Sequence, residues 1–302
     1  MPHKQASTEQ FSFGSAMNIQ NILLATDFSA SSQAALQYAA LVTERFNAHL
    51  VVAHVISESA FKDVPAEILA DAKNRTIVET RRRLEQLRES LNDFEAEFIL
   101  EEGPVADKLL LLAESKSVDF LIVGTRGHSG IKRLLLGSVA EKLSRQARCP
   151  VLVVPDSAVP YKSEVSTLRR FLCPTNFSPR SVTAIKQALE FAKSFSAQLI
   201  LLHVVEEPAL NRADRIALRT AVEERLSGFS SRLSANGPSY EAELVVEFGS
   251  PAEIIVKVAA ERDADLIALS IQRAKAAVAH LAPEITYSVV QQADRPVLTI
   301  AS

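Results

Sequence analysis

The sequence has few cysteines, no long apolar run and little net charge, and each of these absences excludes a class of protein. Its two cysteines, Cys149 and Cys173, are too few for a disulfide framework or a cysteine metal cluster. Each lies beside a proline and an apolar stretch, which predicts buried thiols. No apolar run approaches the length of a membrane-spanning helix. A net charge of −3 gives no electrostatic reason to expect nucleic-acid binding.

The N-terminal segment, Met1 to Ala16, is polar and lacks the basic start and the apolar stretch of a signal peptide. We therefore expect a flexible tail over residues 1–17. Without an export signal, the expected location is the reducing cytoplasm, where the two thiols stay free.

What the sequence does contain is an internal repeat. Three apolar segments recur in the same order in the second half of the chain, the first two at a constant offset of 149 residues. The paired segments are Ile22–Ser29 and Phe171–Ser178, Leu50–Ile56 and Leu199–Val205, and Pro150–Val154 and Pro296–Ile300. Each repeat is long enough to bury its own core. We expect a first repeat over residues 18–155, a linker over 156–167 and a second repeat over 168–302.

Short apolar runs alternate with longer amphipathic ones in each repeat. In the first repeat, strands are expected near residues 21–26, 50–56, 97–100, 119–123 and 150–154. Ser29 can cap the helix that follows the first strand, and Ser178-Pro179 makes the same start in the second repeat. The alternation predicts two tandem Rossmann-like α/β domains, each a five-stranded parallel sheet with helices on both faces.

The loop after the fourth strand of the first repeat carries a pattern that indicates phosphate binding. Gly124 and Gly127 follow the strand directly, and glycines there let the backbone approach a ligand or turn with a positive φ. Gly137 and Ser138 then begin a helix, where free N–H groups and the helix dipole favour an anion. No Gly-Lys-Ser/Thr follows the glycines, so the loop is not a P-loop.

The second repeat lacks this loop. At the same distances from its last strand it has Ser270, Arg273, Pro283 and Glu284, and Asn176 replaces the aspartate at the end of the first strand. A proline removes a backbone donor, and a glutamate places a carboxylate where a phosphate would bind. We therefore expect one phosphate-binding site per chain, in the first repeat.

The spacing Gly124-x-x-Gly127-x9-Gly137-Ser138, with Ala25-Thr26-Asp27-Phe28-Ser29 at the end of the first strand, resembles the ATP-binding type of universal stress protein. The resemblance covers nearly the whole chain after the tail, as two tandem family domains with the motif in the first only. It implies the strand order 3-2-1-4-5 in each domain. It also implies that the domains pair through their last strands, Val151–Val154 and Val297–Ile300.

The same resemblance implies a set of nucleotide-binding residues, and it assigns no catalytic residue and no metal ligand. The set is Thr26, Asp27 and Val55 at the adenosine end, Val123, Gly124 and Gly127 against ribose and phosphates, and Gly137, Ser138 and Val139 at the phosphates. The implied cofactor is ATP or ADP with Mg, and the implied partners are a second chain in a homodimer and an unidentified regulatory protein. Two local alternatives stay open. Asp27 can instead cap the first helix, and His54 and His203, at equivalent strand ends, can be structural.

The leading hypothesis is a cytoplasmic ATP-binding stress-response protein that acts through conformation or assembly, with at most slow ATP hydrolysis or self-phosphorylation. No Ser-His-Asp, Cys-His or paired-carboxylate arrangement and no P-loop lysine points to stronger catalysis. One alternative is a nucleotide-hydrolysing or adenylate-forming enzyme of the related adenine-nucleotide alpha-hydrolase-like fold, although the two repeats leave little room for a substrate domain. The other alternative is a scaffold that binds partners without a nucleotide.

Overall fold

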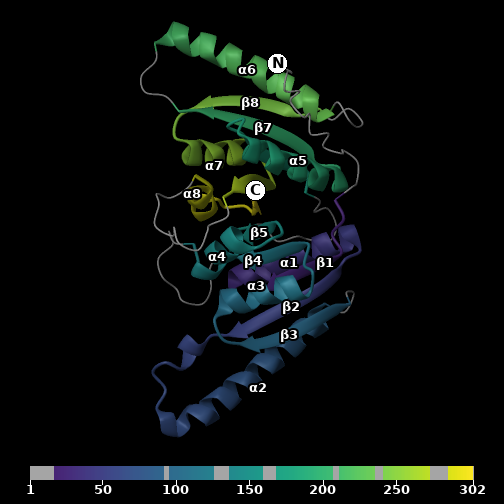
Figure 1. The fold of residues 1–302 in the computed structure, drawn as a ribbon, viewed down its shortest axis with the longest axis vertical. Helices are drawn as coiled ribbons and strands as arrows, with labels where there is room; N and C mark the ends of the chain where they lie inside the picture. Colours follow the sequence, from purple (N-terminus) through teal and green to yellow (C-terminus); the bar gives the residue numbers. More distant parts are fainter. Residues whose placement is uncertain are drawn as a thin grey trace, which may run out of the picture.

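The computed structural model describes residues 17–91, 95–125, 136–158, 168–206, 211–234, 241–272 and 285–301. The expected tail, apart from Met17, and linker residues 159–167 lie outside these ranges. The first repeat contains β1 (Asn21–Ala25), α1 (Ala30–Phe46), β2 (His49–Ile56), the short 3-10 helix η1 (Glu58–Phe61), α2 (Ala66–Ser90), β3 (Ala96–Glu102), α3 (Val105–Ser115), β4 (Phe120–Gly124), α4 (Ser138–Gln146) and β5 (Val151–Val154). The second repeat contains β6 (Arg170–Pro174), α5 (Pro179–Ser194), β7 (Gln198–Val205), α6 (Arg212–Ser234), β8 (Glu243–Phe248), α7 (Pro251–Glu261), β9 (Leu266–Ile271), α8 (Ile285–Gln292) and β10 (Val297–Ala301) (Figure 1).

The turn from the first strand to the first helix is built in the same way in both repeats. Ser29 and Ser178 cap α1 and α5, because each hydroxyl accepts the backbone N–H three residues later at 3.3 Å. Phe28 and Phe177 hold positive φ angles of 63° and 59°. A threonine hydroxyl two residues earlier accepts the N–H of each phenylalanine, at 3.1 and 2.9 Å. Local hydrogen bonds of this kind stabilise the turn, and they explain why the Thr-x-Phe-Ser segment recurs.

The ten strands of the described residues form one mixed sheet, so the expectation of two separate five-stranded sheets was wrong. The order is β3-β2-β1-β4-β5-β10-β9-β6-β7-β8, which keeps the expected 3-2-1-4-5 order inside each repeat. The terminal strands pair as expected: β5 and β10 run antiparallel, with Leu152 opposite Leu298. Thr299 also donates its hydroxyl to the carbonyl of Val151 at 3.1 Å. An unpaired apolar edge strand is a liability, and each repeat covers the other's edge.

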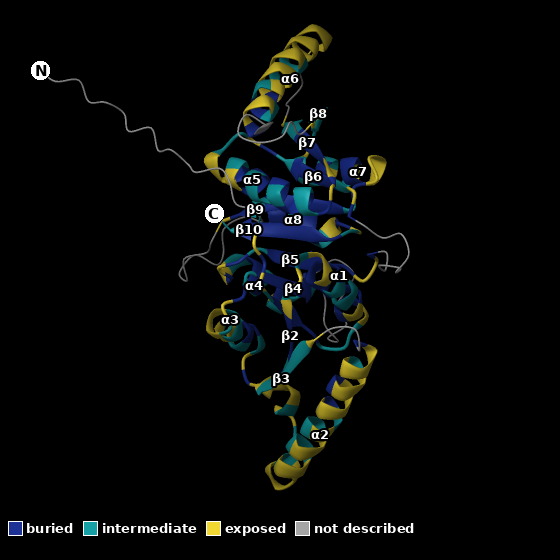
Figure 2. Ribbon diagram, turned by 90° about the vertical axis from the view of Figure 1, so that its right-hand side faces the viewer, coloured by how far each residue is buried: buried dark blue, intermediate teal, exposed yellow. Residues whose placement is uncertain are grey.

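The hydrophobic core also crosses between the repeats. Phe191 of α5 stacks on Phe120 of β4 and on Phe46 of α1, with ring centroids 5.2 and 5.8 Å apart, and it also contacts Phe171 of its own repeat at 5.7 Å. Figure 2 shows buried residues concentrated along the strands in the middle of the molecule, with α2 and α6 largely exposed at its two ends. The repeats therefore share one sheet and two hydrophobic clusters, each of which contains residues of both repeats.

Both cysteines are buried, as the sequence predicts. Burial raises the pKa of the Cys173 thiol well above its usual range, so this thiol stays protonated and unreactive. In the described ranges, no helix is both long enough and apolar enough to cross a membrane.

Tyr38 of α1 provides a test of packing between the repeats. Burial raises its pKa to about 12, the negative charge of Asp265 adds to the rise, and Arg295 opposes it. An unfolded tyrosine ionises near pH 10. The stability that the neutral phenol contributes is therefore complete below pH 10 and is lost as the pH rises from about 10 to about 12. We expect urea-unfolding midpoints to fall across this window in the native sequence and to fall less in Tyr38→Phe. Equal losses in the two proteins would contradict this assignment.

Candidate functional site

A cavity of about 440 Å³ lies at the carboxyl ends of β1, β2 and β4 in the first repeat. This is the edge of a parallel α/β sheet at which ligands usually bind. Eight of the nine residues that the sequence analysis assigned to nucleotide binding line this one cavity: Thr26, Asp27, Val55, Val123, Gly124, Gly137, Ser138 and Val139. The ninth, Gly127, lies outside the described residues.

Asp27 is half-buried in the cavity wall and is not the cap of α1. Its Oδ1 accepts the N–H and the hydroxyl of Ser29, at 3.0 and 2.5 Å, and Ser29 is the capping residue. In the second repeat, Asn176 accepts the N–H of Ser178 at 3.1 Å. The carboxylate therefore fixes the capping serine, and it is the one acidic side chain among the described residues that line the cavity.

The two strand-end histidines have the same structural role in both repeats. The Nδ1 atoms of His54 and His203 lie 2.8 and 2.7 Å from the carbonyl oxygens of Thr26 and Thr175. Each ring also packs against the phenylalanine of its turn, with centroids 4.9 and 4.8 Å apart. A geometry that recurs in the repeat without the glycine loop belongs to the fold, although His54 also lines the cavity.

Gly124 is required by helix packing. A Cβ atom at this position would lie 2.5 Å from Oγ of Ser31 and 2.8 Å from its carbonyl carbon, closer than real Cβ contacts allow. Its φ is not among the positive ones, so of the two reasons that the sequence offered for this glycine, close approach and a positive φ, close approach applies here. Ser270 occupies this place in the second repeat, where β6 and β9 pair over two residues, against four for β1 and β4.

The N-terminus of α4 forms another wall of the cavity, and one of its expected donors is already used. The N–H of Gly137 donates to the carbonyl of Thr125 at 2.8 Å, so it is not available to a phosphate as the sequence analysis expected. The first intrahelical bond runs from Glu141 to Gly137 at 3.0 Å. The N–H groups of Ser138 and Val139 precede it and have no intrahelical acceptor. These two amides and the Ser138 hydroxyl remain as donors.

Thr125 is a site residue that the sequence analysis missed. It lines the cavity, it is 4% exposed, and its hydroxyl has no hydrogen-bond partner within the described residues. Its backbone is held at both ends, since its N–H donates to Val154 at 2.8 Å and its carbonyl accepts from Gly137. The second repeat has Ile271 at this position, one residue after Ser270. This replacement of a hydroxyl by a hydrocarbon between the repeats was the sequence signal that could have identified Thr125 as a site residue.

The remaining walls come from residues outside the glycine motif. Val105 and Leu109 of α3 add apolar surface, while Ser57 and Thr76 add hydroxyls near η1 and on α2. Among the described lining residues there is no lysine or arginine. The basic residues of the loop after β4, such as Arg126 and Lys132, lie outside the described residues. The cavity thus combines an apolar body with hydroxyl and amide donors at one end.

Comparisons with known proteins agree with this architecture. The universal stress protein family model matches the chain twice, over residues 18–155 and 167–301. A universal stress protein of Mycolicibacterium smegmatis is 25% identical over 293 residues, which cover 92% of this chain and 96% of the relative. One from Methanocaldococcus jannaschii is 32% identical over 138 residues, which cover 45% of this chain and 81% of the relative. The crystal structure of a universal stress protein from Archaeoglobus fulgidus has a TM-score of 0.68 at 23% identity, and covers 93% of this chain and 98% of that chain. This chain therefore belongs to the universal stress protein family.

Proposed function

We propose that this chain is a regulatory stress-response protein that binds one adenine nucleotide, ATP or ADP, in the cavity of its first repeat. The observation that supports the proposal is the buried Thr125 hydroxyl, which has no partner in the described structure and belongs to a residue that lines the cavity beside a helix N-terminus. Leaving a buried hydroxyl unpaired costs about 1–3 kcal/mol, and a ligand oxygen relieves that cost. The second repeat has Ile271 at this position and therefore has no hydroxyl there that needs a partner.

The two ends of the cavity suit the two ends of a nucleotide. The amides of Ser138 and Val139, with the dipole of α4, favour the negative charge of phosphates. At the other end, Asp27 can accept hydrogen bonds from ribose hydroxyls or an adenine amino group, and Val55 provides apolar contact for a base. A volume of about 440 Å³ lies within the range of small-molecule sites.

Magnesium fits this site as a companion of the nucleotide. The ion takes oxygen ligands and usually binds through phosphates, waters and one or two carboxylates. The one carboxylate of the described wall, Asp27, is assigned to the adenosine, so the ion would be held by the phosphates and by waters. When bound, the ion would neutralise phosphate charge. The residues of the chain would bind and orient the nucleotide. The effect of nucleotide binding would pass through Thr125 to β5, because the N–H of Thr125 donates to the carbonyl of Val154, in the strand that joins the two repeats.

Isothermal titration of the full chain with ATP tests the proposal directly. We expect one nucleotide per chain, because the second repeat has isoleucine and serine where the first has Thr125 and Gly124. Two equivalent sites per chain, or no binding by nucleotide-free protein, would contradict it.

Replacing Thr125 tests whether its buried hydroxyl binds the nucleotide. In Thr125→Val we expect ATP affinity to fall at least about tenfold, since a hydrogen bond to a charged ligand contributes about 1.5–3 kcal/mol. The free energy of unfolding without ligand should stay equal or rise, because the variant removes an unpaired buried hydroxyl. Thr125→Ser keeps the hydroxyl and should bind nearly as well as the native protein. If both variants bind ATP like the native chain, the hydroxyl does not contact the ligand.

A further inference from the structure

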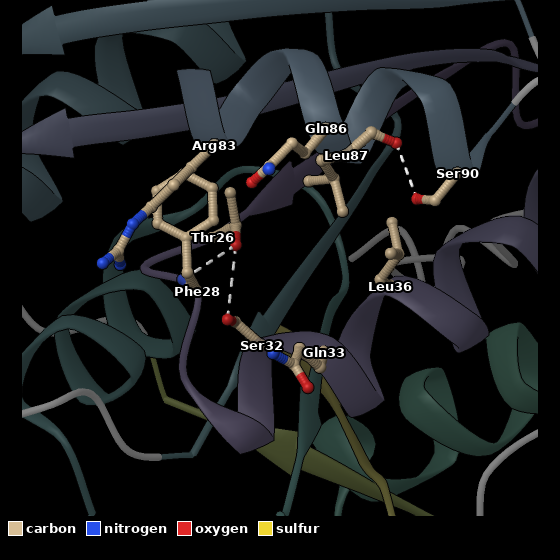
Figure 3. Close-up of a pocket in the computed structure, with 9 residues that line it drawn as sticks. All are labelled: Thr26, Phe28, Ser32, Gln33, Leu36, Arg83, Gln86, Leu87 and Ser90. Atoms are coloured by element: carbon tan, nitrogen blue, oxygen red, sulfur yellow. Dashed lines mark hydrogen bonds between the residues drawn. The ribbon is translucent and has the colours of Figure 1, made fainter. Parts of the chain in front are cut away.

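A second cavity, of about 340 Å³, lies between α1 and the last turns of α2. Figure 3 shows side chains of α2 on one side of it and of α1, including Ser32, on the other, with Thr26 between them. These two residues also line the nucleotide cavity, and the Thr26 hydroxyl donates to that of Ser32 at 3.3 Å. The two cavities therefore share this pair of residues in their walls.

The second repeat provides an internal comparison for this place. Leu84 and Leu91 of α2 correspond to Leu226 and Leu233 of α6, since all four are buried at the same spacing. Arg83 and Arg225, which precede two of these leucines, lie over the rings of Phe28 and Phe177. The guanidinium carbons are 5.7 and 4.1 Å from the ring centroids. The two helices can therefore be compared residue by residue.

In the second repeat the same place is filled. Leu87 corresponds to Phe229, which is 5% exposed and makes an edge contact with Phe177, with ring centroids 6.2 Å apart. Leu36 of α1 corresponds to Ile185, which is 1% exposed. In the first repeat both Leu36 and Leu87 are only half-buried. The fold can thus close this space with its own side chains, and the first repeat leaves it open.

The polar groups around the open space include several hydrogen-bond donors, and a carboxylate engages one of them in part. Gln33 and Gln86 stand where the second repeat has Val182 and Gly228, and within the described residues neither carboxamide makes a hydrogen bond. Arg83 donates through Nε to Glu79 at 3.2 Å. A guanidinium has five N–H donors, so its terminal nitrogens remain for another acceptor. No acidic side chain is among the described residues that line this cavity.

We propose that this cavity is a second small-molecule site, for an organic monoanion with a short apolar body. The apolar body would cover Phe28, Leu36 and Leu87, and the anionic group would bind the Arg83 guanidinium and the two carboxamides. The volume of about 340 Å³ is at the lower end of the range for small-molecule sites, which limits the ligand to less than a nucleotide. The site is separate from the nucleotide cavity and does not depend on the function proposed for it.

The test uses nucleotide-free full-length protein and amide-detected NMR titration with benzoate, phenylacetate and hexanoate, each against its neutral carboxamide. We expect at least one acid to shift, saturably, the amides in the first turns of α1 and the last turns of α2. The matching carboxamide should bind about fivefold more weakly, and Arg83→Gln should weaken the acid by a similar factor because the charge-assisted bond is lost.

Leu87→Phe imports the residue of the second repeat and should abolish these shifts while the protein stays folded, because Phe229 is accommodated at the equivalent place. ATP titration of the same variant should match the native chain, which separates this site from the proposed nucleotide site. The proposal is overturned if none of the three acids shifts these amides, if Leu87→Phe binds them unchanged, or if acids and carboxamides bind equally.

Discussion

Ser138→Glu is expected to weaken ATP binding by at least tenfold while leaving the fold intact. The variant removes a hydroxyl donor at the start of α4, and a hydrogen bond to a charged group contributes about 1.5–3 kcal/mol. It also places a carboxylate beside the phosphates, which adds repulsion. The second repeat already has Glu284 at this position of its motif. Isothermal titration of the purified variant measures the effect.

Two further variants distinguish the loss of the hydroxyl from the repulsion by the added carboxylate. Ser138→Ala removes the hydroxyl alone, and Ser138→Gln has the size of glutamate without its charge, so we expect both to bind more tightly than Ser138→Glu. The folded state should not suffer, because an acidic residue in the first turn of a helix interacts favourably with the dipole. An unchanged dissociation constant for Ser138→Glu would show that phosphates do not bind at this helix start.

Gly124→Val is expected to have the largest effect on stability. Its Cβ would lie within 3 Å of Ser31, including a backbone atom that cannot move without shifting α1. Overpacking of this kind costs about 1–3 kcal/mol, and contact with backbone places the variant at the upper end. For a chain of this size we expect the melting temperature to fall by about 2–4 °C per kcal/mol. Calorimetry of the nucleotide-free protein measures the shift.

The second repeat supplies the matched control for this glycine. Ser270→Gly removes a side chain at the equivalent position. There, β6 and β9 pair only over two residues, and the pairing ends before Ser270. We expect its melting temperature to change little, because no close contact is relieved. A Gly124→Val protein as stable as the native chain would mean that α1 can shift at no cost, and that Gly124 is not held by packing.

Local signals predicted most of the secondary structure. The Ser29 and Ser178 caps and the apolar strand runs depend on neighbours within a few residues, so they can be identified from the sequence alone. The repeat also predicted that both halves would have one strand order, and the resemblance supplied that order. Eight of the nine residues assigned to the nucleotide site lie around one cavity, because the carboxyl ends of neighbouring parallel strands meet at one edge.

Only the tertiary structure decided how the repeats combine and what several site residues do. Whether β5 and β10 stay edges or join depends on surfaces that are far apart in the sequence, and the antiparallel pair turns two sheets into one. Gly124 is explained by Ser31, and the Gly137 amide is used by Thr125; neither contact follows from a motif. The cavity beside Leu87 likewise exists because a leucine stands where the second repeat packs Phe229. The sequence by itself determined the repeat, its elements and the place of the site, since these depend on local pattern. Packing between distant segments determined which atoms remain free to bind a ligand.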